Sequence, residues 1–297
     1  MTSPSSDSSR FFALRSKLSP DVDKRIELLK AACDKRDVEY IDFDIKAADH
    51  TDLPKLGVGD MLFQIARGPM FMTRLLANEN VATVYKSYQD VLNRRLQLIP
   101  HQQAGLPMPK TIHYLTKDPA LLAKYVEYCG GFPIILKAMG GSHGVGVMKI
   151  DSFSSLVSVV DHVLGDTKLI MRELIETTTS ERLVVLGSQV VDSYQYRQQG
   201  DDIRSNVGDE MDVVPKRYPK QMQMDAVRAV NLLGIEFGGV DMLMDAEGHH
   251  YIIESNVPYC NFPRAQMLSG LDIAGMVVDH LLAKVERIKE HVQLPGT

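Results

Sequence analysis

The sequence predicts an α/β fold, and three patterns support this prediction. From Phe11 onward, short apolar runs alternate with amphipathic segments, as strands and helices do in units built around a parallel sheet. Residues 140–146 form a glycine-rich segment between two apolar runs, and residues 239–256 have the pattern of a strand, a tight turn and a second strand. We therefore expect a parallel α/β unit near the N-terminus and further sheets after it.

The N-terminal unit is expected over about residues 10–85. Ser19-Pro20 predicts the start of a helix that runs to about Arg36, because serine caps a helix N-terminus and proline fits the first turn. The strands predicted around this helix lie at 11–14, 40–45 and 60–66.

Proline residues divide the next part of the chain. Residues 92–99 predict a helix that Pro100 ends, and Pro107 and Pro109 interrupt the chain again. Beyond them we expect strands at 134–137 and 147–150, strands of a later sheet at 169–175, 182–186 and 189–197, and helices at 151–164, 221–233 and 273–289.

The composition is that of an ordinary soluble globular protein, since 44% of the 297 residues are hydrophobic and 24% are charged. The formal net charge of -5 predicts no basic surface for nucleic acid or an anionic membrane, and no apolar run approaches the roughly 18 to 20 residues that span a bilayer. Cys33, Cys129 and Cys260 are widely spaced and odd in number, so they predict neither a disulfide framework nor a zinc site. The expected location is the reducing cytoplasm.

The first chemical signal is the glycine-rich segment. Its small residues include Gly140, Gly141, Ser142 and Gly144. Such a loop lets backbone N–H groups approach a polyphosphate, and Lys137 at the end of the preceding strand adds a positive charge. The lysine precedes the glycines, so the segment is not a P-loop. Taken alone, a glycine-rich hairpin is more often a structural turn.

The second signal is a set of oxygen ligands on the strand–turn–strand segment. With 246–247 at the centre of the turn, Asp241 pairs with Ile252 across the two strands. Because side chains alternate along a strand, Asp241, Glu254 and Asn256 then share one face. Two carboxylates and an amide oxygen suit Mg²⁺ that is held together with nucleotide phosphates. The alternative is a solvated sheet face, although acids within apolar strands need polar or cationic partners.

In their order along the chain, these segments resemble the ATP-grasp superfamily and, within it, the RimK-like carboxylate–amine ligases. The resemblance extends from about Asn93 to the C-terminal helix. Seven motifs carry it, namely the Lys137 loop, Arg172-Glu173-Leu174-Ile175, Arg182 with Leu183 to Gly187, Arg204-Ser205-Asn206, Gly239-Val240-Asp241, Glu254-Ser255-Asn256 and Gly270-Leu271-Asp272-Ile273-Ala274-Gly275.

The resemblance implies an ATP-dependent ligase that activates a carboxylate as an acyl phosphate, forms an amide or peptide bond and releases ADP and phosphate. Asp241, Glu254 and Asn256 would hold two Mg²⁺ ions, with Mn²⁺ as a substitute. Arg204 would face the transferred phosphate and the oxyanion of the tetrahedral intermediate, and Arg182 the substrate carboxylate or acyl phosphate. The implied nucleotide contacts are Arg94, Lys137, Gly140, Gly141, Ser142, Gly144, Glu173, Leu174, Ile175, Ser180, Glu181, Ser205 and Asn206.

The chain departs from the family pattern at two nucleotide positions. Asn93-Arg94 stands where Asp-Lys is frequent, and a planar guanidinium is not equivalent to an ammonium. Ser180, beside Glu181, stands where an aspartate commonly contacts the ribose. Either of the two residues can take that role.

Two arginines are candidates for binding a substrate. The segment 257–264 lacks the usual glycine, so it can shape an acceptor pocket in which Arg264 binds an anionic substrate. Cys260 within it is expected to be a packed thiol rather than a nucleophile. Arg67 follows the third predicted strand, at a place where related ligases bring an arginine toward the active site, and a capped turn is its alternative role.

The implied organisation has a disordered N-terminus at 1–9, a pre-ATP-grasp α/β domain at 10–90, a small lobe with a glycine-rich flap at 91–168 and a C-terminal lobe with the Mg²⁺ site at 169–297. The two ATP-grasp lobes would clasp the nucleotide. Amino acids or peptides are the expected substrates, with neither nucleic acid nor membrane as a partner, and a homo-oligomer is compatible with the sequence.

Two other activities remain open at this point. The same fold can pass phosphate to a hydroxyl group, as a kinase does, or bind a nucleotide without turnover. Retention of both acids together with Lys137 favours turnover.

Overall fold

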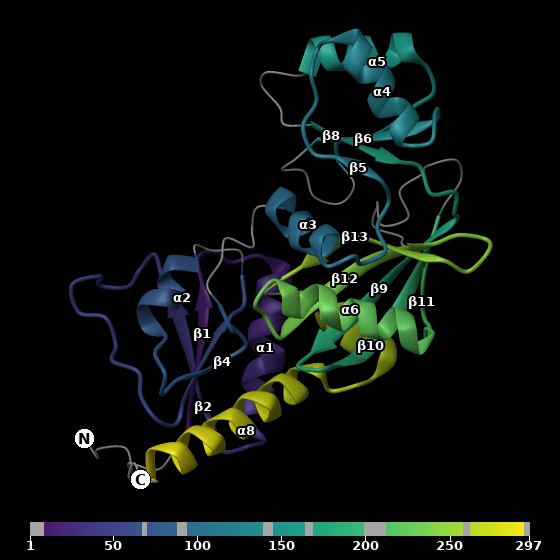
Figure 1. The fold of residues 1–297 in the computed structure, drawn as a ribbon. Coiled ribbons are helices and arrows are strands. Elements are labelled where there is room, and N and C mark those ends of the chain that lie inside the picture. The colour runs from purple at the N-terminus through teal and green to yellow at the C-terminus, as the bar shows by residue number, and fades with distance from the viewer. Residues whose placement is uncertain are drawn as a thin grey trace.

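The computed structural model describes residues 9–66, 70–87, 94–138, 145–163, 169–198, 212–257 and 262–293. The strands in these ranges form three sheets, which follow one another in space from the N-terminal unit to a projecting small unit (Figure 1). Among the described residues, none of the helices has the length and apolar character that a membrane crossing requires.

The first sheet is parallel, with the strand order β2-β1-β3-β4. The Ser19 hydroxyl accepts a hydrogen bond from the Val22 N–H at 3.4 Å, so the first helix begins where the sequence predicts. The three predicted strands and the helix are confirmed, whereas the short α2 and β4 were not anticipated. The elements of this unit are β1 (Arg10–Arg15), α1 (Pro20–Asp34), β2 (Glu39–Asp44), β3 (Asp60–Gln64), α2 (Met70–Leu76) and β4 (Ala82–Thr83).

The second sheet is antiparallel, with the order β5-β8-β6-β7. Its strands are β5 (Thr111–Ile112), β6 (Ile134–Ala138), β7 (Val147–Ile150) and β8 (Leu169–Glu173), and its helices are α4 (Pro119–Tyr128) and α5 (Phe153–Val163). Both helices lie on the side of the sheet that faces away from the rest of the molecule (Figure 1). Helix α4 was not predicted, although the Asp118 carboxylate caps it and Pro119 follows, which is the same signal that identified α1.

The third sheet is antiparallel, with the order β11-β10-β9-β12-β13. Helix α6 contacts β9, β10, β12 and β13, while α7 contacts β10 and α8. Helix α8 also contacts α1, β3 and β4, so it joins this sheet to the N-terminal unit. The elements are α3 (Arg94–Gln103), β9 (Thr179–Leu186), β10 (Gln189–Arg197), β11 (Asp212–Pro215), α6 (Lys220–Leu232), β12 (Phe237–Met244), β13 (His250–Asn256), α7 (Phe262–Ser269) and α8 (Ile273–Gln293).

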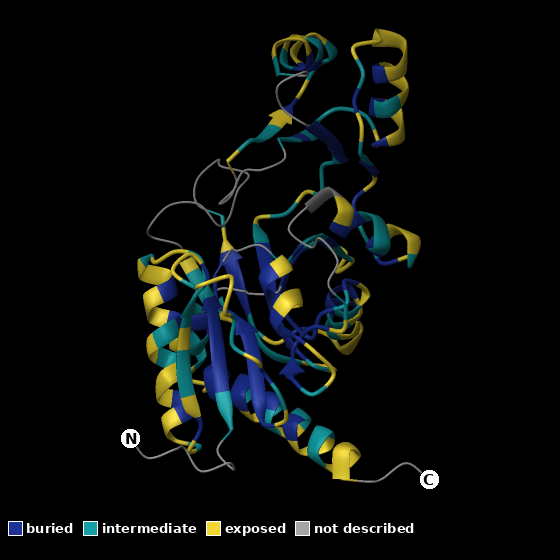
Figure 2. Ribbon diagram, turned by 90° about the vertical axis from the view of Figure 1, so that its left-hand side faces the viewer, coloured by how far each residue is buried: buried dark blue, intermediate teal, exposed yellow. Residues whose placement is uncertain are grey.

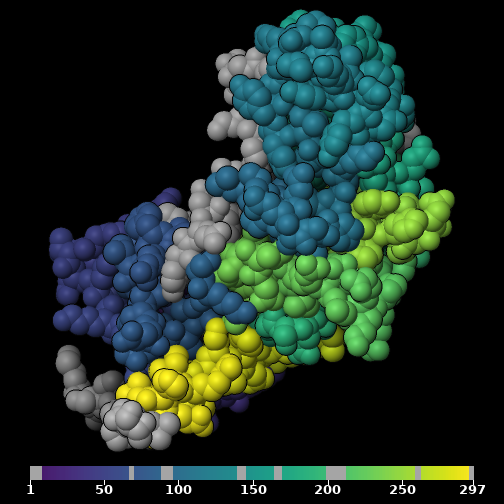
Figure 3. Space-filling model, in the orientation of Figure 1, coloured from purple at the N-terminus to yellow at the C-terminus, as the bar shows by residue number. Residues whose placement is uncertain are grey.

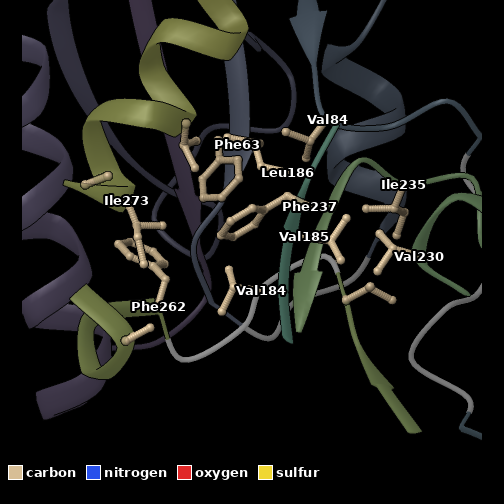
Figure 4. Close-up of a cluster of buried hydrophobic side chains, with 14 of the residues drawn as sticks. Phe63, Val84, Val184, Val185, Leu186, Val230, Ile235, Phe237, Phe262 and Ile273 are labelled. Atoms are coloured by element: carbon tan, nitrogen blue, oxygen red, sulfur yellow. The ribbon is translucent and has the colours of Figure 1, made fainter. Parts of the chain in front are cut away.

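One hydrophobic core serves both the first and the third sheets. Phe63 of β3, Phe237 of β12 and Phe262 of α7 are fully buried and meet there (Figure 4). The ring centroids of Phe63 and Phe237 are 5.6 Å apart, and those of Phe237 and Phe262 are 6.0 Å apart. Buried strands lie inside and half-exposed helices outside (Figure 2). Because one core holds the two sheets together, they provide a rigid base for the site above them.

Two predicted elements require correction. Helix α3 does not end before Pro100 but continues to Gln103, because packing of its last turn outweighs the lost hydrogen bond and the steric clash of an interior proline. His101, which is buried, has its Nε2 2.9 Å from the carbonyl of Ala229 and anchors this last turn to α6. Strand β8 ends at Glu173 and belongs to the second sheet rather than the later one, because it pairs with β5 and β6.

Candidate active site

A pocket of about 790 Å³ lies between the second and third sheets. One wall is formed by β6, β7 and β8, the other by β12 and β13, and the segment 174–178 that connects the two sheets contributes to the lining. The second-sheet unit projects above the third sheet, so the pocket lies at the junction of the two (Figure 3). Its volume is within the range of pockets that enclose cofactors and small substrates.

Two acids lie on the wall of this pocket, and an amide contacts both of them. Asp241 on β12 pairs directly with Glu254 on β13. Asn256 donates from Nδ2 to Asp241 Oδ2 at 2.8 Å and to Glu254 Oε1 at 3.4 Å. The predicted common face for these three side chains is therefore confirmed.

The predicted pairing of Asp241 with Ile252 is wrong. The turn has one residue more than expected, since the N–H of Asp245 donates to the carbonyl of His249 at 3.0 Å. A glycine in the left-handed conformation, Gly248 at φ +88, makes this longer turn accessible. The register then shifts after Met242, which leaves Ile253 as the extra residue of a bulge on β13.

A lysine from the second sheet reaches the acids. Lys137 lies near the end of β6, and its Nζ is 2.7 Å from Glu254 Oε2. Strands β6 and β7 form the predicted hairpin, with the Ala138 N–H donating to the Gly146 carbonyl at 2.8 Å. Gly146 has φ +83, and a Cβ there would come within 2.8 Å of the Ala138 side chain. This position therefore requires glycine.

An arginine from β9 holds the other acid. Arg182 pairs with Asp241 across the two strands. Its Nε and Nη2 donate to the two oxygens of the Asp241 carboxylate, the second at 2.8 Å. Both side chains are less than a tenth exposed. Burial opposes the charge on Arg182, but the carboxylate of Asp241 raises the arginine pKa well above its ordinary value.

The donor set fits a hard divalent cation such as Mg²⁺. Two carboxylates face the same point, and a half-turn of the Asn256 amide brings its oxygen there as well. Burial raises the pKa of Asp241, Arg182 opposes that shift, and the nearby charge of Glu254 adds to it. The acids are thus crowded, and a bound cation would relieve their repulsion.

Comparison with known protein families matches residues 88–281 of this chain to the RimK-like ATP-grasp domain. The chain belongs to the RimK-like ATP-grasp family. Its curated relatives include a probable alpha-L-glutamate ligase of Vibrio parahaemolyticus, 26% identical over 234 residues that make up 77% of this chain and 75% of that protein. Another, from Rhodopirellula baltica, is 28% identical over 79% of this chain and 57% of its own length.

Solved ATP-grasp structures share the fold. The ligase PsnB, complexed with a phosphomimetic variant of its minimal precursor, Mg and ADP, is 19% identical, with a TM-score of 0.70 over 93% of this chain and 98% of that chain. D-alanine–D-alanine ligase from Bacillus anthracis is 14% identical, with a TM-score of 0.68 over 96% and 99% of the two chains. The predicted family and α/β ATP-grasp fold are confirmed, and the predicted class of ATP-dependent ligase agrees with the names of these relatives.

In this RimK-like ATP-grasp protein, three of the expected nucleotide contacts lie at the end of β8 and in the connection that follows it. Glu173, Leu174 and Ile175 all line the pocket. The Glu173 carboxylate accepts a hydrogen bond from the Lys110 N–H at 3.0 Å, and the Glu173 N–H donates to the Lys110 carbonyl at 3.0 Å. The carboxylate therefore already has a backbone partner.

The two candidates for the ribose contact differ in position. Ser180 lines the pocket. Glu181 has no exposed surface, and its Oε1 accepts hydrogen bonds from Thr179 Oγ1 at 2.8 Å and Gln195 Nε2 at 3.2 Å. Burial raises the pKa of Glu181. Of the pair, Ser180 is the one placed for direct contact with a ligand.

Several residues that line the pocket were given no role from the sequence. They include Arg172, Lys149, Gln195 and Lys216. Arg172 had a visible signal, because a charged residue directly follows the apolar run at 169–171. Lys216 lies just beyond β11, where nothing in the local sequence indicates which sheet the strand joins.

Other predicted site residues fall outside the described ranges. These are Arg67, Gly140, Gly141, Ser142, Gly144, Arg204, Ser205 and Asn206, together with Cys260 and the side chain of Arg94. Arg264 is described, and it lies half-buried on α7 rather than on the expected loop. Pro263 favours that helix, because proline is accommodated in a first turn.

Proposed function

We propose that this RimK-like ATP-grasp protein binds ATP with Mg²⁺ in the pocket between its second and third sheets and uses it to join a carboxylate to an amine. The observation that carries the proposal is a row of charged side chains that begins on the pocket wall and continues into the protein. Lys137 contacts Glu254, Glu254 pairs with Asp241, and Asp241 is held by Arg182. Lys137, Glu254 and Asp241 line the pocket, whereas Arg182 is buried beside Asp241. One cation next to a hard-oxygen site suits nucleotide phosphates with Mg²⁺, which supports the proposal.

The nucleotide can be placed from the residues that line the pocket. Its polyphosphate would lie at Lys137, and its base at Glu173 to Ile175, with the Ser180 hydroxyl near the ribose. Backbone N–H groups and the lysine ammonium would donate hydrogen bonds to the phosphate oxygens. The glycine-rich loop, Arg94, Ser205 and Asn206 complete the proposed nucleotide site.

The residues that would hold Mg²⁺ are Asp241, Glu254 and Asn256, and two ions, replaceable by Mn²⁺, are part of the proposal. When bound, Mg²⁺ offsets the negative charge of the transferred phosphoryl group. Lys137 would leave Glu254, bind a phosphate oxygen instead and remain beside the reacting groups. Arg204, with Asn206, would bind the phosphate and the oxyanion that forms when the amine attacks the acyl phosphate.

The role proposed for Arg182 differs from the substrate contact that its motif implies. Its guanidinium is buried and donates twice to Asp241, so contact with a substrate would break a buried ion pair, at a cost of several kcal/mol. We therefore propose that Arg182 orients Asp241. Arg264 and Arg67 are the proposed anchors for substrate carboxylates.

Amino acids or peptides are the proposed substrates. The names of the curated relatives make glutamate the first amine donor to test. In the proposed division, the small lobe keeps β8 and ends near residue 173, and the C-terminal lobe follows it. We also propose a cytoplasmic location, because Cys33 and Cys129 are buried free thiols, and leave self-association to be measured.

The decisive experiment is a screen for Mg²⁺-dependent ADP release with pairs of amino acids, followed by mass spectrometry of the products. Hydroxylamine is added in parallel, because a ligase converts the acyl phosphate into a hydroxamate. A stable phosphorylated product instead of a hydroxamate would identify a kinase-like phosphotransferase. ATP binding without ADP release in any mixture would identify a non-catalytic nucleotide-binding module.

A further inference from the structure

Arg172 is a buried cation in the pocket that none of the roles above uses. It lies on β8 and is only 5% exposed. Its Nη1 donates to the carbonyl of Ile253 at 2.9 Å, and among the described residues its Nε has no partner. Burying a charge is costly unless it is paired and hydrogen-bonded. A guanidinium kept here with a carbonyl as its hydrogen-bond partner therefore needs a specific reason.

The partner of Arg172 is the bulge on β13. Ile253 is the extra residue of that bulge, so its backbone lies outside the regular ladder of hydrogen bonds. A partly buried carbonyl in this situation needs a donor from elsewhere, and Arg172 supplies one. Glu254 follows directly in the chain, so holding the Ile253 carbonyl fixes the peptide plane that leads into the Glu254 side chain.

The same hydrogen bond crosses between two sheets. Arg172 belongs to the second sheet and Ile253 to the third. Lys137 makes a second connection of this type, from the second sheet to Glu254. Both connections end on adjacent residues of β13. They differ in the group that is bound. Lys137 binds a carboxylate that would become a metal ligand, whereas Arg172 binds a backbone carbonyl.

We propose that Arg172 is a positioning residue that holds the bulge at Ile253, so that Glu254 stays aligned with Asp241 and Asn256. Its hydrogen bond also keeps the second sheet joined to β13 when Lys137 turns from Glu254 to the nucleotide. This inference rests on the proposed function of the pocket. It assigns Arg172 to the support of the metal site and not to contact with the substrate.

The test uses Arg172→Met, which keeps the side-chain stem and removes both the charge and the donors, and Arg172→Lys, which restores a charge and a donor. Mn²⁺ binding is titrated by electron paramagnetic resonance with saturating ADP, and ADP binding without metal by calorimetry. Groups that orient metal ligands typically contribute 10- to 100-fold to metal affinity. Arg172→Met should weaken Mn²⁺ binding by about that factor, with metal-free ADP binding nearly unchanged and partial recovery in Arg172→Lys.

The matched control is Lys149→Met, which removes another pocket-lining cation from the second sheet. Lys149 is exposed, its Nζ lies 3.8 Å from Asp151 Oδ1, and among the described residues no hydrogen bond or ion pair joins it to β13. Mn²⁺ binding in this variant should stay close to that of the wild type. A loss as large as that in Arg172→Met would show a general charge effect and overturn the inference.

Other outcomes separate this inference from the proposed function. Wild-type Mn²⁺ affinity in Arg172→Met, or an equal loss of metal-free ADP binding, contradicts the role of Arg172 and leaves the proposed function intact. A wild-type protein that binds neither ADP nor Mn²⁺ contradicts both. Where Arg172→Met does not fold in thermal unfolding, Arg172→Gln carries the same expectation and the same contradicting result.

Discussion

Lys137 Nζ lies 2.7 Å from Glu254 Oε2 and joins the second sheet to the third across the pocket. Both side chains are less than a fifth exposed, so this pair is more strongly attracted than one in open water. In the proposed complex each side chain would bind a different group, because the lysine would bind phosphate and the acid would bind a divalent cation. The pair thus keeps the site balanced in charge until nucleotide and metal enter.

Replacing Lys137 should weaken nucleotide use. Lys137→Met removes a charge-assisted hydrogen bond, which typically contributes about 1.5 to 3 kcal/mol, so the KM for ATP should rise by about tenfold or more. ADP release at varied ATP measures this. An unchanged KM would remove Lys137 from the phosphate site.

Glu254→Gln should nearly abolish turnover. The variant keeps the shape of the side chain but loses the charge needed beside a divalent cation, and Mg²⁺-dependent ADP release should fall by at least about 100-fold. Glu286→Gln, on the exposed surface of α8, is the control and should behave as the wild type. Unaltered ADP release in Glu254→Gln would contradict the assignment of Glu254 as a metal ligand.

Asp241 and Arg182 should stabilise the fold as a unit. Asp241→Ala leaves the guanidinium buried without a counter-charge, which typically destabilises a protein by about 3 to 5 kcal/mol. The double variant Asp241→Ala/Arg182→Met removes both charges and should lose less stability than Asp241→Ala and Arg182→Met together. Urea unfolding measures the three free energies. Additive losses would show that the two side chains do not act together.

The shared core should be sensitive at Phe237. Phe237→Ala opens a cavity between the first and third sheets and should reduce the free energy of unfolding by about 3 to 5 kcal/mol. Met267 on α7 is 77% exposed, and Met267→Ala should change stability by no more than about 0.5 kcal/mol. Equal effects of the two substitutions in thermal or urea unfolding would contradict the packing described for the three phenylalanines.

Stability should depend on acid pH through Glu236. Burial opposes ionisation, but hydrogen bonds from His280 at 3.1 Å and Lys284 at 2.5 Å outweigh it and lower the pKa of Glu236 from 4.5 to about 2. A lowered folded-state pKa contributes stability above pH 4.5 that is lost as the pH falls toward 2, at most about 3 kcal/mol. Unfolding from pH 6 to pH 2 should therefore be less pH-dependent in Glu236→Gln. The same pH dependence in both proteins would refute the assignment.

Local patterns were enough to predict several parts of this protein. The cap at Ser19, the strand alternation that puts Asp241, Glu254 and Asn256 on one face, and the hairpin after Lys137 all depend on residues close together in the chain. The longer turn and the bulge at Ile253 each add one residue, so together they shift the pairing by two and leave Asp241 and Glu254 on the predicted common face. The ordered motifs were also sufficient to identify the family.

Only the tertiary structure decided how distant residues meet. Lys137 and Glu254 are 117 positions apart, and Arg182 and Asp241 are 59 apart, so no rule of local periodicity relates them. The continuation of α3 through Pro100, the membership of β8 in the second sheet and the bulge at Ile253 likewise depend on packing partners elsewhere in the chain. Propensity and alternation are properties of neighbouring residues, whereas these features are set by the free energy of contacts between distant segments of the chain.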